Sequence, residues 1–254
     1  MSFLKLFERN NLISAHRGAR SIAPENTLRS MKKSVGDCDF IEIDVQLSSD
    51  FASIIMHDET LNRTTNALEI YREKSSYKVS DFTLKELDAL DYGSWFDAHK
   101  EPLLTFEIAL KFIKKQNLFL NVEIKDMSKI FSDEVVVSKV INEIKSWHVE
   151  ELVIISSFRH EYLPLCKKIL PNIPTAALVE KKHPKDIVKY LNKLDVECYN
   201  MSDKLVDKEM VLKLKKAGFF VGAYTINDKA RAKELFEMGV NAIFTDTLKK
   251  SDLL

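Results

Sequence analysis

Short apolar runs recur along the chain, and longer stretches with helical spacing of apolar residues separate most of them. Many of the runs are rich in isoleucine and valine, and they lie at 12–15, 40–45, 52–56, 118–124, 152–156, 175–179, 196–199, 218–224 and 242–245. Helix-like stretches lie at 132–147, 185–194, 207–217 and 229–238. Strands that alternate with helices predict parallel strands joined by crossovers.

The second and third runs are too close together to be joined by such a crossover. A parallel connection needs about a dozen residues or more, and only about six separate these two runs. We therefore expect an antiparallel hairpin, with its turn near Ser49-Asp50-Phe51 and with His57 opposite Asp44. Without the hairpin's second strand, eight parallel strands remain. This number predicts an α/β fold, a (β/α)8 TIM-type barrel with an extra hairpin strand.

The pattern indicates one domain over residues 1–254, because no linker or low-complexity segment interrupts it. The stretch at about 59–104 fits no simple βα unit, and we interpret it as a small insertion after the hairpin. It contains an expected short helix at 83–90, which a Thr83/Glu86 capping box would open. The insertion would lie on the rim where a barrel builds its active site. Contact with the substrate and a purely structural role both stay open.

Composition and net charge limit the classes of partner that the protein can bind. Lys and Arg together number 38, as do Asp and Glu, so the chain has no global field for nucleic acid or an anionic membrane. Attraction for an anionic substrate must be local. Three cysteines without metal or disulfide spacing favour free thiols in a reducing compartment. Residues 1–11 lack the pattern of a secretory signal, and no apolar run is long enough for a stable membrane insertion. We expect a cytoplasmic protein; its oligomeric state stays open.

Acidic residues interrupt two of the apolar runs at alternate positions. Glu42 and Asp44 would share one face of a strand, with Ile41 and Ile43 on the other. Two carboxylates inside a barrel would repel each other and lose hydration, and a divalent cation would offset both costs. Exposed charges on an edge strand are the alternative. Glu123 can supply a third ligand.

Lys125 would lie nearer the carboxyl end of the same strand as Glu123, where barrel enzymes build their sites. It can contact a phosphate oxygen or pair with a ligand carboxylate. An internal Glu123–Lys125 ion pair without metal is the alternative.

Two histidines follow expected strands and can divide the work of proton transfer. His16 and Arg17 directly follow the first strand, and His57 follows the hairpin. One histidine can withdraw a proton from a nucleophile while the other supplies one to a leaving oxygen. The Arg17 guanidinium can grip a phosphate through two N–H groups. The remaining histidines are expected on the surface: His99, His148, His160 and His183.

An ordered set of motifs resembles the glycerophosphodiester phosphodiesterase family nearly end to end. The set comprises His16-Arg17-Gly18, Pro24-Glu25-Asn26-Thr27, Glu42-Ile43-Asp44, His57-Asp58-Glu59-Thr60-Leu61-Asn62-Arg63-Thr64-Thr65, Leu87-Asp88-Ala89-Leu90-Asp91-Tyr92-Gly93-Ser94-Trp95-Phe96, Val122-Glu123-Ile124-Lys125, Ser156-Ser157-Phe158, Tyr224-Thr225-Ile226-Asn227 and Gly239-Val240-Asn241-Ala242-Ile243-Phe244-Thr245-Asp246.

The resemblance implies a TIM-type barrel that binds one divalent cation, Mg²⁺ or Ca²⁺. It implies hydrolysis of a small glycerophosphodiester to glycerol 3-phosphate and an alcohol, through a cyclic phosphate. The roles that it implies are acid and base for His16 and His57, metal ligands for Glu42, Asp44 and Glu123, and substrate contacts for Arg17, Lys125 and Tyr224. Two alternatives stay open: phospholipase D-like hydrolysis of lysophospholipids or sphingomyelin, and a non-catalytic binding barrel.

Several positions depart from the pattern of this family. Small, glycine-rich residues are common where Ala19-Arg20 stands, a turn glycine where Phe51 stands, and tryptophan at Tyr224. Proline is usual at Leu104, and Pro-Asp at Thr247-Leu248. None of these changes removes an expected acid, base or ligand.

Overall fold

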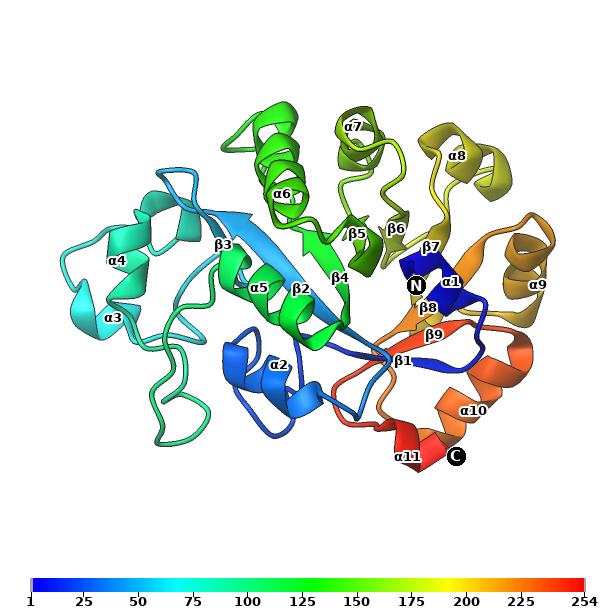
Figure 1. Cartoon of the computed structure of the whole chain (residues 1–254), viewed down its shortest axis with the longest axis horizontal. Helices are drawn as coiled ribbons and strands as arrows, with labels where there is room; N and C mark the ends of the chain where they lie inside the picture. Colours follow the sequence, from blue (N-terminus) through cyan, green and yellow to red (C-terminus); the bar gives the residue numbers. More distant parts are fainter. Residues whose placement is uncertain (1, 254) are drawn as a thin grey trace.

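A closed barrel forms the centre of the protein. The structure is a computed structural model and describes residues 2–253. One nine-stranded sheet runs in the order β1-β9-β8-β7-β6-β5-β4-β2-β3, and pairing of β1 with β2 closes it (Figure 1). All strands except β3 pair in parallel, so eight of them form the barrel and confirm the expected fold. The strands are β1 (Leu12–Ala15), β2 (Phe40–Leu47), β3 (Ser53–Ile55), β4 (Phe119–Ile124), β5 (Val153–Ser157), β6 (Thr175–Val179), β7 (Cys198–Ser202), β8 (Phe220–Tyr224) and β9 (Ala242–Thr245).

Helices cover the outside of the barrel, where the outward side chains of the strands meet them. Ile41, Ile43 and Val45 of β2 lie in this outer core, as the alternation predicts. The helices between or after the barrel strands are α2 (Leu28–Ser34), α5 (Phe106–Gln116), α6 (Asp133–Trp147), α7 (Tyr162–Ile169), α8 (Ile187–Leu194), α9 (Lys208–Lys216), α10 (Lys229–Met238) and α11 (Lys250–Leu253), with short 3₁₀ turns η2 (Glu150–Leu152) and η3 (Asp203–Leu205). Side-chain caps at Thr105, Ser132, Asp207 and Asp228 open four of them.

A short helix near the N-terminus closes the barrel at the amino ends of its strands. Phe3, Leu6 and Phe7 of α1 (Phe3–Phe7) pack on apolar side chains that point into the barrel. The Phe3 ring lies 5.3 Å from that of Phe40, centroid to centroid. Because this end is filled by aromatic rings, a substrate can enter only from the carboxyl ends of the strands.

The hairpin forms as expected, but its register differs by one residue. Val45 pairs with Ile55, and the Met56 amide donates to the Asp44 carbonyl oxygen over 2.9 Å. Met56 therefore lies opposite Asp44, and the expectation that His57 would do so is wrong. The turn lies where it was expected, centred on Asp50, whose carboxylate accepts a hydrogen bond from the Ser48 hydroxyl. A turn centred on position 50 pairs position 44 with position 56 rather than with 57. His57 follows the last residue of β3 by two positions, so strand alternation does not fix the direction of its side chain.

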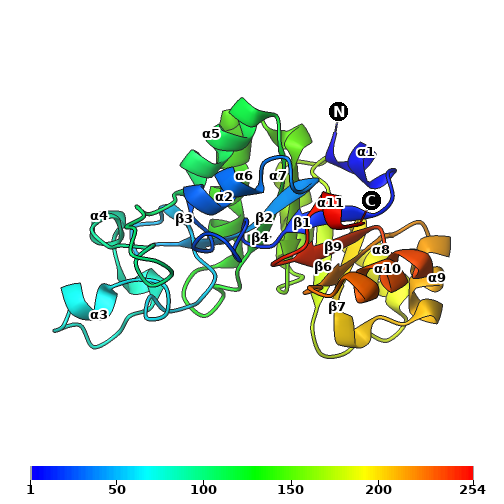
Figure 2. The same ribbon diagram turned by 90° about the horizontal axis from the view of Figure 1, so that it is seen from below.

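The segment between β3 and α5 forms a separate layer beside the barrel. It contains α3 (Ala67–Ile70), η1 (Val79–Asp81) and α4 (Leu84–Asp88) around an apolar cluster of its own. Both views place α3 and α4 beyond β3, away from the other strands (Figures 1 and 2). The expected Thr83/Glu86 capping box opens α4, although that helix ends at Asp88 rather than at 90. None of the helices that residues 2–253 form combines the length and the apolar character of a membrane span.

Candidate active site

Three carboxylates converge at the carboxyl ends of two neighbouring strands. Glu42 and Asp44 come from β2 and Glu123 from β4, and the register pairs Asp44 with Glu123. One oxygen from each lies within 4.8 Å of the others. Glu42 and Asp44 are 3% and 1% exposed, so neither is an edge-strand surface charge. The alternation in the sequence thus leads to one buried acidic cluster.

The partners of these carboxylates leave oxygen atoms free. Glu42 Oε2 accepts a hydrogen bond from the Arg17 amide over 2.8 Å, while Glu42 Oε1 is buried without a hydrogen-bond partner in the described chain. Asp44 Oδ2 accepts from Asn26 over 2.8 Å. Asp44 Oδ1 lies 3.2 Å from the Lys125 ammonium, without hydrogen-bond geometry. Unpaired buried carboxylate oxygens are what a hard cation such as Mg²⁺ or Ca²⁺ binds, so the donor set fits such an ion.

The electrostatics of the cluster lead to the same conclusion. Burial, and then the charges of Asp44 and Glu123, raise the pKa of Glu42 well above its usual range. Burial raises the pKa of Glu123 to about 7, although Lys125 opposes the shift. Burial also disfavours the Asp44 anion, but the positive charge of Lys125 and further partners hold its pKa below the usual range. One lysine therefore does not neutralise three carboxylates. The Glu123–Lys125 ion pair does form, at 2.7 Å, but it leaves Glu42 Oε1 without a hydrogen-bond partner in the described chain.

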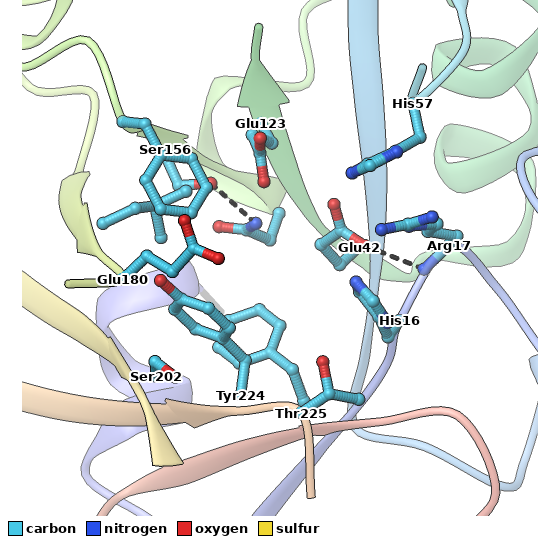
Figure 3. A pocket seen from close by; sticks show the side chains of 14 residues that line it. His16, Arg17, Glu42, His57, Glu123, Ser156, Glu180, Ser202, Tyr224 and Thr225 are labelled. Atoms are coloured by element: carbon cyan, nitrogen blue, oxygen red, sulfur yellow. Dashed lines mark hydrogen bonds between the residues drawn. The ribbon is translucent and has the colours of Figure 1, made fainter. Parts of the chain in front are cut away.

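Each of the two expected histidines is held by an aspartate through the same ring nitrogen. His16 Nδ1 lies 2.7 Å from Asp246 Oδ1, and His57 Nδ1 lies 2.7 Å from Asp58 Oδ1. Such bonds fix the ring and leave Nε2 to face a ligand. Burial and the charges of Lys125 and Arg17 lower the pKa of His57, against the opposing charge of Asp44. Figure 3 shows both rings on the same side of the cavity as Glu42.

A buried glutamate connects the two histidine–aspartate pairs. Glu25 accepts hydrogen bonds from Arg17 and Arg63 and lies 3.0 Å from Arg20. Arg63 also donates to Asp58, over 2.6 Å. Arg20 lies 3.4 Å from Asp246. The Pro24-Glu25-Asn26-Thr27 segment therefore holds the loop that carries the site.

The loop after β1 requires glycine at one position. Gly18 has φ +77°, and a Cβ atom there would lie 2.4 Å from the Ser30 hydroxyl oxygen. That hydroxyl donates to the Arg17 carbonyl oxygen and belongs to the Thr27/Ser30 capping box of α2. Close packing of Gly18 on α2 thus sets the position of Arg17 and its neighbour His16.

Most of the expected site residues line one cavity of about 530 Å³ at the mouth of the barrel. Six of the eight expected site residues line it: His16, Arg17, Glu42, His57, Glu123 and Tyr224. Asp44, two positions after Glu42 in β2, is buried and does not line this cavity. Lys125 lines a smaller adjoining cavity of about 220 Å³, which shares His57, Glu123 and Phe158 with the first. The side chains expected to act together therefore converge at one site.

The family of the chain follows from comparison with known proteins. The model of the glycerophosphoryl diester phosphodiesterase family matches residues 16–250. The chain belongs to this family. It is therefore a phosphoric diester hydrolase, as the motifs predicted.

Curated relatives and solved structures agree with the family match. A glycerophosphodiester phosphodiesterase of Bacillus altitudinis is 33% identical over 92% of this chain and 94% of its own. One from Caldanaerobacter subterraneus subsp. tengcongensis is 32% identical over 92% and 93%. An Oleispira antarctica phosphodiesterase, solved with the product sn-glycerol-3-phosphate, superposes with a TM-score of 0.83 at 29% identity and covers 95% of both chains.

Several residues of this phosphodiesterase site were not predicted as functional. They are Arg20, Glu25, Asp246, Ser156, Phe158, Glu180, Ser202 and Thr225. Asp246 directly follows the last residue of β9, and Glu180 directly follows that of β6. Their place at the carboxyl ends of barrel strands was a signal in the sequence that could have identified them.

The remaining histidines divide into two kinds. His99 and His148 are exposed, as expected. The expectation is wrong for His160 and His183, which are half-buried. Both ring nitrogens of His160 form hydrogen bonds, with the Tyr190 hydroxyl and the Leu178 carbonyl. His183 forms similar bonds with the Tyr199 hydroxyl and the Leu205 carbonyl. His160 thus connects the loop after β5 to β6 and α8, and His183 connects the loop after β6 to β7 and η3.

Proposed function

We propose that this enzyme hydrolyses glycerophosphodiesters to glycerol 3-phosphate and an alcohol, with His16 and His57 as the proton-transfer groups. The observation that carries the proposal is the convergence of two aspartate-held histidines on the same cavity as a carboxylate cluster with unpaired oxygens. The sn-glycerol-3-phosphate in the related Oleispira antarctica structure supports the choice of product.

Glu42, Asp44 and Glu123 would hold one divalent cation, Mg²⁺ or Ca²⁺. When bound, the cation offsets negative charge on the phosphoryl oxygens during the reaction. Arg17 and Lys125 lie on this side of the cavity and would bind the phosphate. The Arg17 guanidinium donates a hydrogen bond to Glu25, and the Arg17 backbone amide donates one to Glu42. Because the side chain is already held in place, little conformational entropy is lost when substrate binds.

The two histidines would act in turn on the glycerol hydroxyl and the leaving alcohol. One Nε2 withdraws the proton of the substrate's 2-hydroxyl as its oxygen attacks phosphorus, and the other Nε2 donates a proton to the departing alkoxide oxygen. The product of this step is a cyclic phosphate. Water then opens the ring with the two proton transfers reversed, which restores both histidines. Attack within one molecule gains from proximity.

We also propose that the chain acts as one barrel domain with an insertion at about 59–104. Its residue Arg63 supports the site through Glu25 and Asp58, while the main cavity is lined by residues outside the segment 59–104. A cytoplasmic location stays a prediction. The three cysteines are buried free thiols, which is compatible with it.

The direct test is a panel of glycerophosphodiesters with released glycerol 3-phosphate measured. The protein is assayed with Mg²⁺ or Ca²⁺ and with a chelator. Release that requires the cation supports the proposal. Release of choline from lysophosphatidylcholine, with no glycerol 3-phosphate from any diester, would favour the phospholipase D-like alternative instead.

A further inference from the structure

Two carboxylates of the acidic cluster are each held by hydrogen bonds to one oxygen atom. Glu42 Oε2 accepts a hydrogen bond from the Arg17 backbone amide over 2.8 Å (Figure 3). Asp44 Oδ2 accepts one from the Asn26 side-chain amide over 2.8 Å, and the Arg17 guanidinium lies 3.6 Å from the same oxygen. Glu42 Oε1 is buried without a hydrogen-bond partner in the described chain, and so is Asp44 Oδ1, which lies 3.2 Å from the Lys125 ammonium.

The third carboxylate of the cluster is held in the same way. Glu123 Oε1 accepts a hydrogen bond from the Lys125 ammonium over 2.7 Å, which leaves Oε2 for a ligand. A cation that used both oxygens of any of the three carboxylates would lie against the positive hydrogen of the donor already bound there. The cluster therefore offers three single oxygen ligands, and the remaining positions around an ion would be filled by water or phosphate oxygens.

The backbone fixes the position of the Asn26 amide. Asn26 is buried in a left-handed conformation with φ 55°, which asparagine adopts more readily than most residues. Its backbone N–H donates to the Arg17 carbonyl oxygen over 3.0 Å. Its side-chain oxygen accepts a hydrogen bond from the Asp44 backbone N–H over 3.4 Å, in addition to the bond that its amide donates to Oδ2. These two contacts resist rotation of the Asp44 carboxylate toward a geometry in which both oxygens face an ion.

Mg²⁺ and Ca²⁺ differ in the ligands that they require. Ca²⁺ takes roughly six to eight oxygens at about 2.3–2.6 Å, often including both oxygens of a carboxylate. Mg²⁺ requires near-octahedral geometry at about 2.0–2.1 Å and usually keeps several waters beside one or two carboxylates. Single oxygens on rigidly held side chains suit the smaller ion, because they supply few ligands and cannot rearrange into a larger shell.

We propose that Asn26 is a specificity-determining residue for the cation and that, by holding Asp44 Oδ2, it makes the cluster prefer Mg²⁺ over Ca²⁺. The inference rests on the proposed function, since it concerns the cation of that reaction. Arg17 and Lys125 hold the other two carboxylates, but both would also bind the phosphate. Asn26 does not line the main cavity, so its substitution tests the ion without removing a substrate contact.

The test measures binding of Mg²⁺ and of Ca²⁺ to chelator-treated protein by isothermal titration calorimetry, without substrate. We expect the wild-type protein to bind Mg²⁺ at least as tightly as Ca²⁺. Asn26→Gly suits the left-handed backbone, removes the amide and frees Asp44 Oδ2. It should weaken Mg²⁺ binding by roughly 10–100-fold, as the loss of a partner that orients a metal ligand does. Ca²⁺ binding should fall by at most about threefold, because the freed oxygen can become an additional ligand.

Asn117→Gly is the matched control. Asn117 is exposed and also left-handed, with φ 51°, and it precedes β4 at the amino end of that strand, away from the acidic cluster. The same substitution in the same conformation should leave both dissociation constants at their wild-type values. Tighter binding of Ca²⁺ than of Mg²⁺ by the wild-type protein would overturn the inference, and so would an equal loss for both ions in Asn26→Gly.

Infrared difference spectra of the wild-type protein, with and without Mg²⁺, test the same point without a variant. The antisymmetric and symmetric carboxylate stretches lie farther apart when a carboxylate binds through one oxygen than when it binds through two. We expect the wider separation, and the narrower one would contradict the inference. Normal Mg²⁺ preference with no release of glycerol 3-phosphate would refute the proposed function alone. Binding of neither ion would refute its cation and this inference together.

Discussion

Arg63 and Glu25 are joined by two hydrogen bonds, of 2.6 and 3.0 Å, although 38 positions separate them. Arg63 extends this link to Asp58 and so to His57. Arg20 forms the equivalent connection from Glu25 to Asp246 and His16. One buried carboxylate therefore supports both histidines from behind, and three arginines share it.

The first prediction concerns this shared support. Glu25→Gln should lower kcat by roughly 10–100-fold, as the loss of a partner that orients a functional group does. Without the negative charge of Glu25, Arg63 and Arg20 are no longer held against Asp58 and Asp246, so these aspartates orient the histidines less well. Activity against substrate concentration, with the thermal midpoint as a check on folding, measures the effect.

Asp97→Asn is the matched control for Glu25→Gln. Asp97 also pairs with an arginine, Arg29, at 3.0 Å, but it contacts neither histidine. The Asp97→Asn enzyme should have a kcat within about twofold of the wild-type value, because the loss of an exposed ion pair usually has a small effect. A Glu25→Gln enzyme with normal kcat and an unchanged pH profile would show that the network does not orient the histidines.

The second prediction concerns pH and the cation. Burial raises the pKa of Glu123 to about 7 and that of Glu42 well above its usual range. A group with a raised folded pKa contributes stability that is present below its unfolded value, near 4.5, and is lost as pH rises through the folded value. The metal-free protein should therefore lose stability between about pH 4.5 and 7. Added Mg²⁺ or Ca²⁺ should restore it above pH 7, because the ion binds the deprotonated oxygens.

Thermal midpoints at pH 5 and pH 7.5, with and without the ion, measure this linkage. Glu42→Gln should reduce both the loss on raising the pH and the gain on adding the ion. If the midpoint of the wild-type protein responds equally to the ion at both pH values, the three carboxylates are not its ligands.

The third prediction concerns the loop that carries His16 and Arg17. Gly18→Ala adds a methyl group 2.4 Å from the Ser30 hydroxyl and forces alanine into a left-handed conformation. Gly36 has a similar φ of +88°, but nothing lies within 4 Å of the added atom. Gly36→Ala should thus cost only the conformational strain, about 1–2 kcal/mol in the free energy of unfolding.

Gly18→Ala should cost more than Gly36→Ala and should also raise KM, because the loop must shift where it binds phosphate. Chemical denaturation and steady-state kinetics on the two variants separate these effects. Equal stability loss and equal KM in both would mean that close packing of Gly18 on α2 does not set the loop.

The sequence predicted the barrel well because its strands are short, apolar and regularly spaced. β1, β6 and β9 have the predicted bounds, and the Glu42/Asp44 alternation led directly to the acidic cluster. The one-residue register error concerns the hairpin, whose turn is centred on Asp50 as expected and therefore pairs Asp44 with Met56. Phe51 adopts φ 63° there without glycine, and its ring packs on Phe131, a contact that local pattern does not reveal.

The missed residues are those whose role depends on distant parts of the chain. Asp246 lies 230 positions from His16 in the sequence. The role of Glu25 depends on its contacts with Arg63 and Arg20. Arg20 was recognised only as a departure from the family pattern, whereas the structure gives it two acidic partners. Motif spacing predicts which chemistry is present, but the contacts that orient it arise from closure of the barrel.

The most direct measurement is the rate of glycerol 3-phosphate release by wild-type, His16→Ala and His57→Ala enzymes at saturating Mg²⁺ or Ca²⁺. The account predicts that each substitution lowers kcat by roughly 10²–10⁴-fold, since each removes a proton-transfer group. Folding should be preserved, because both rings line the cavity rather than the core. Near-normal rates in both variants would contradict the account.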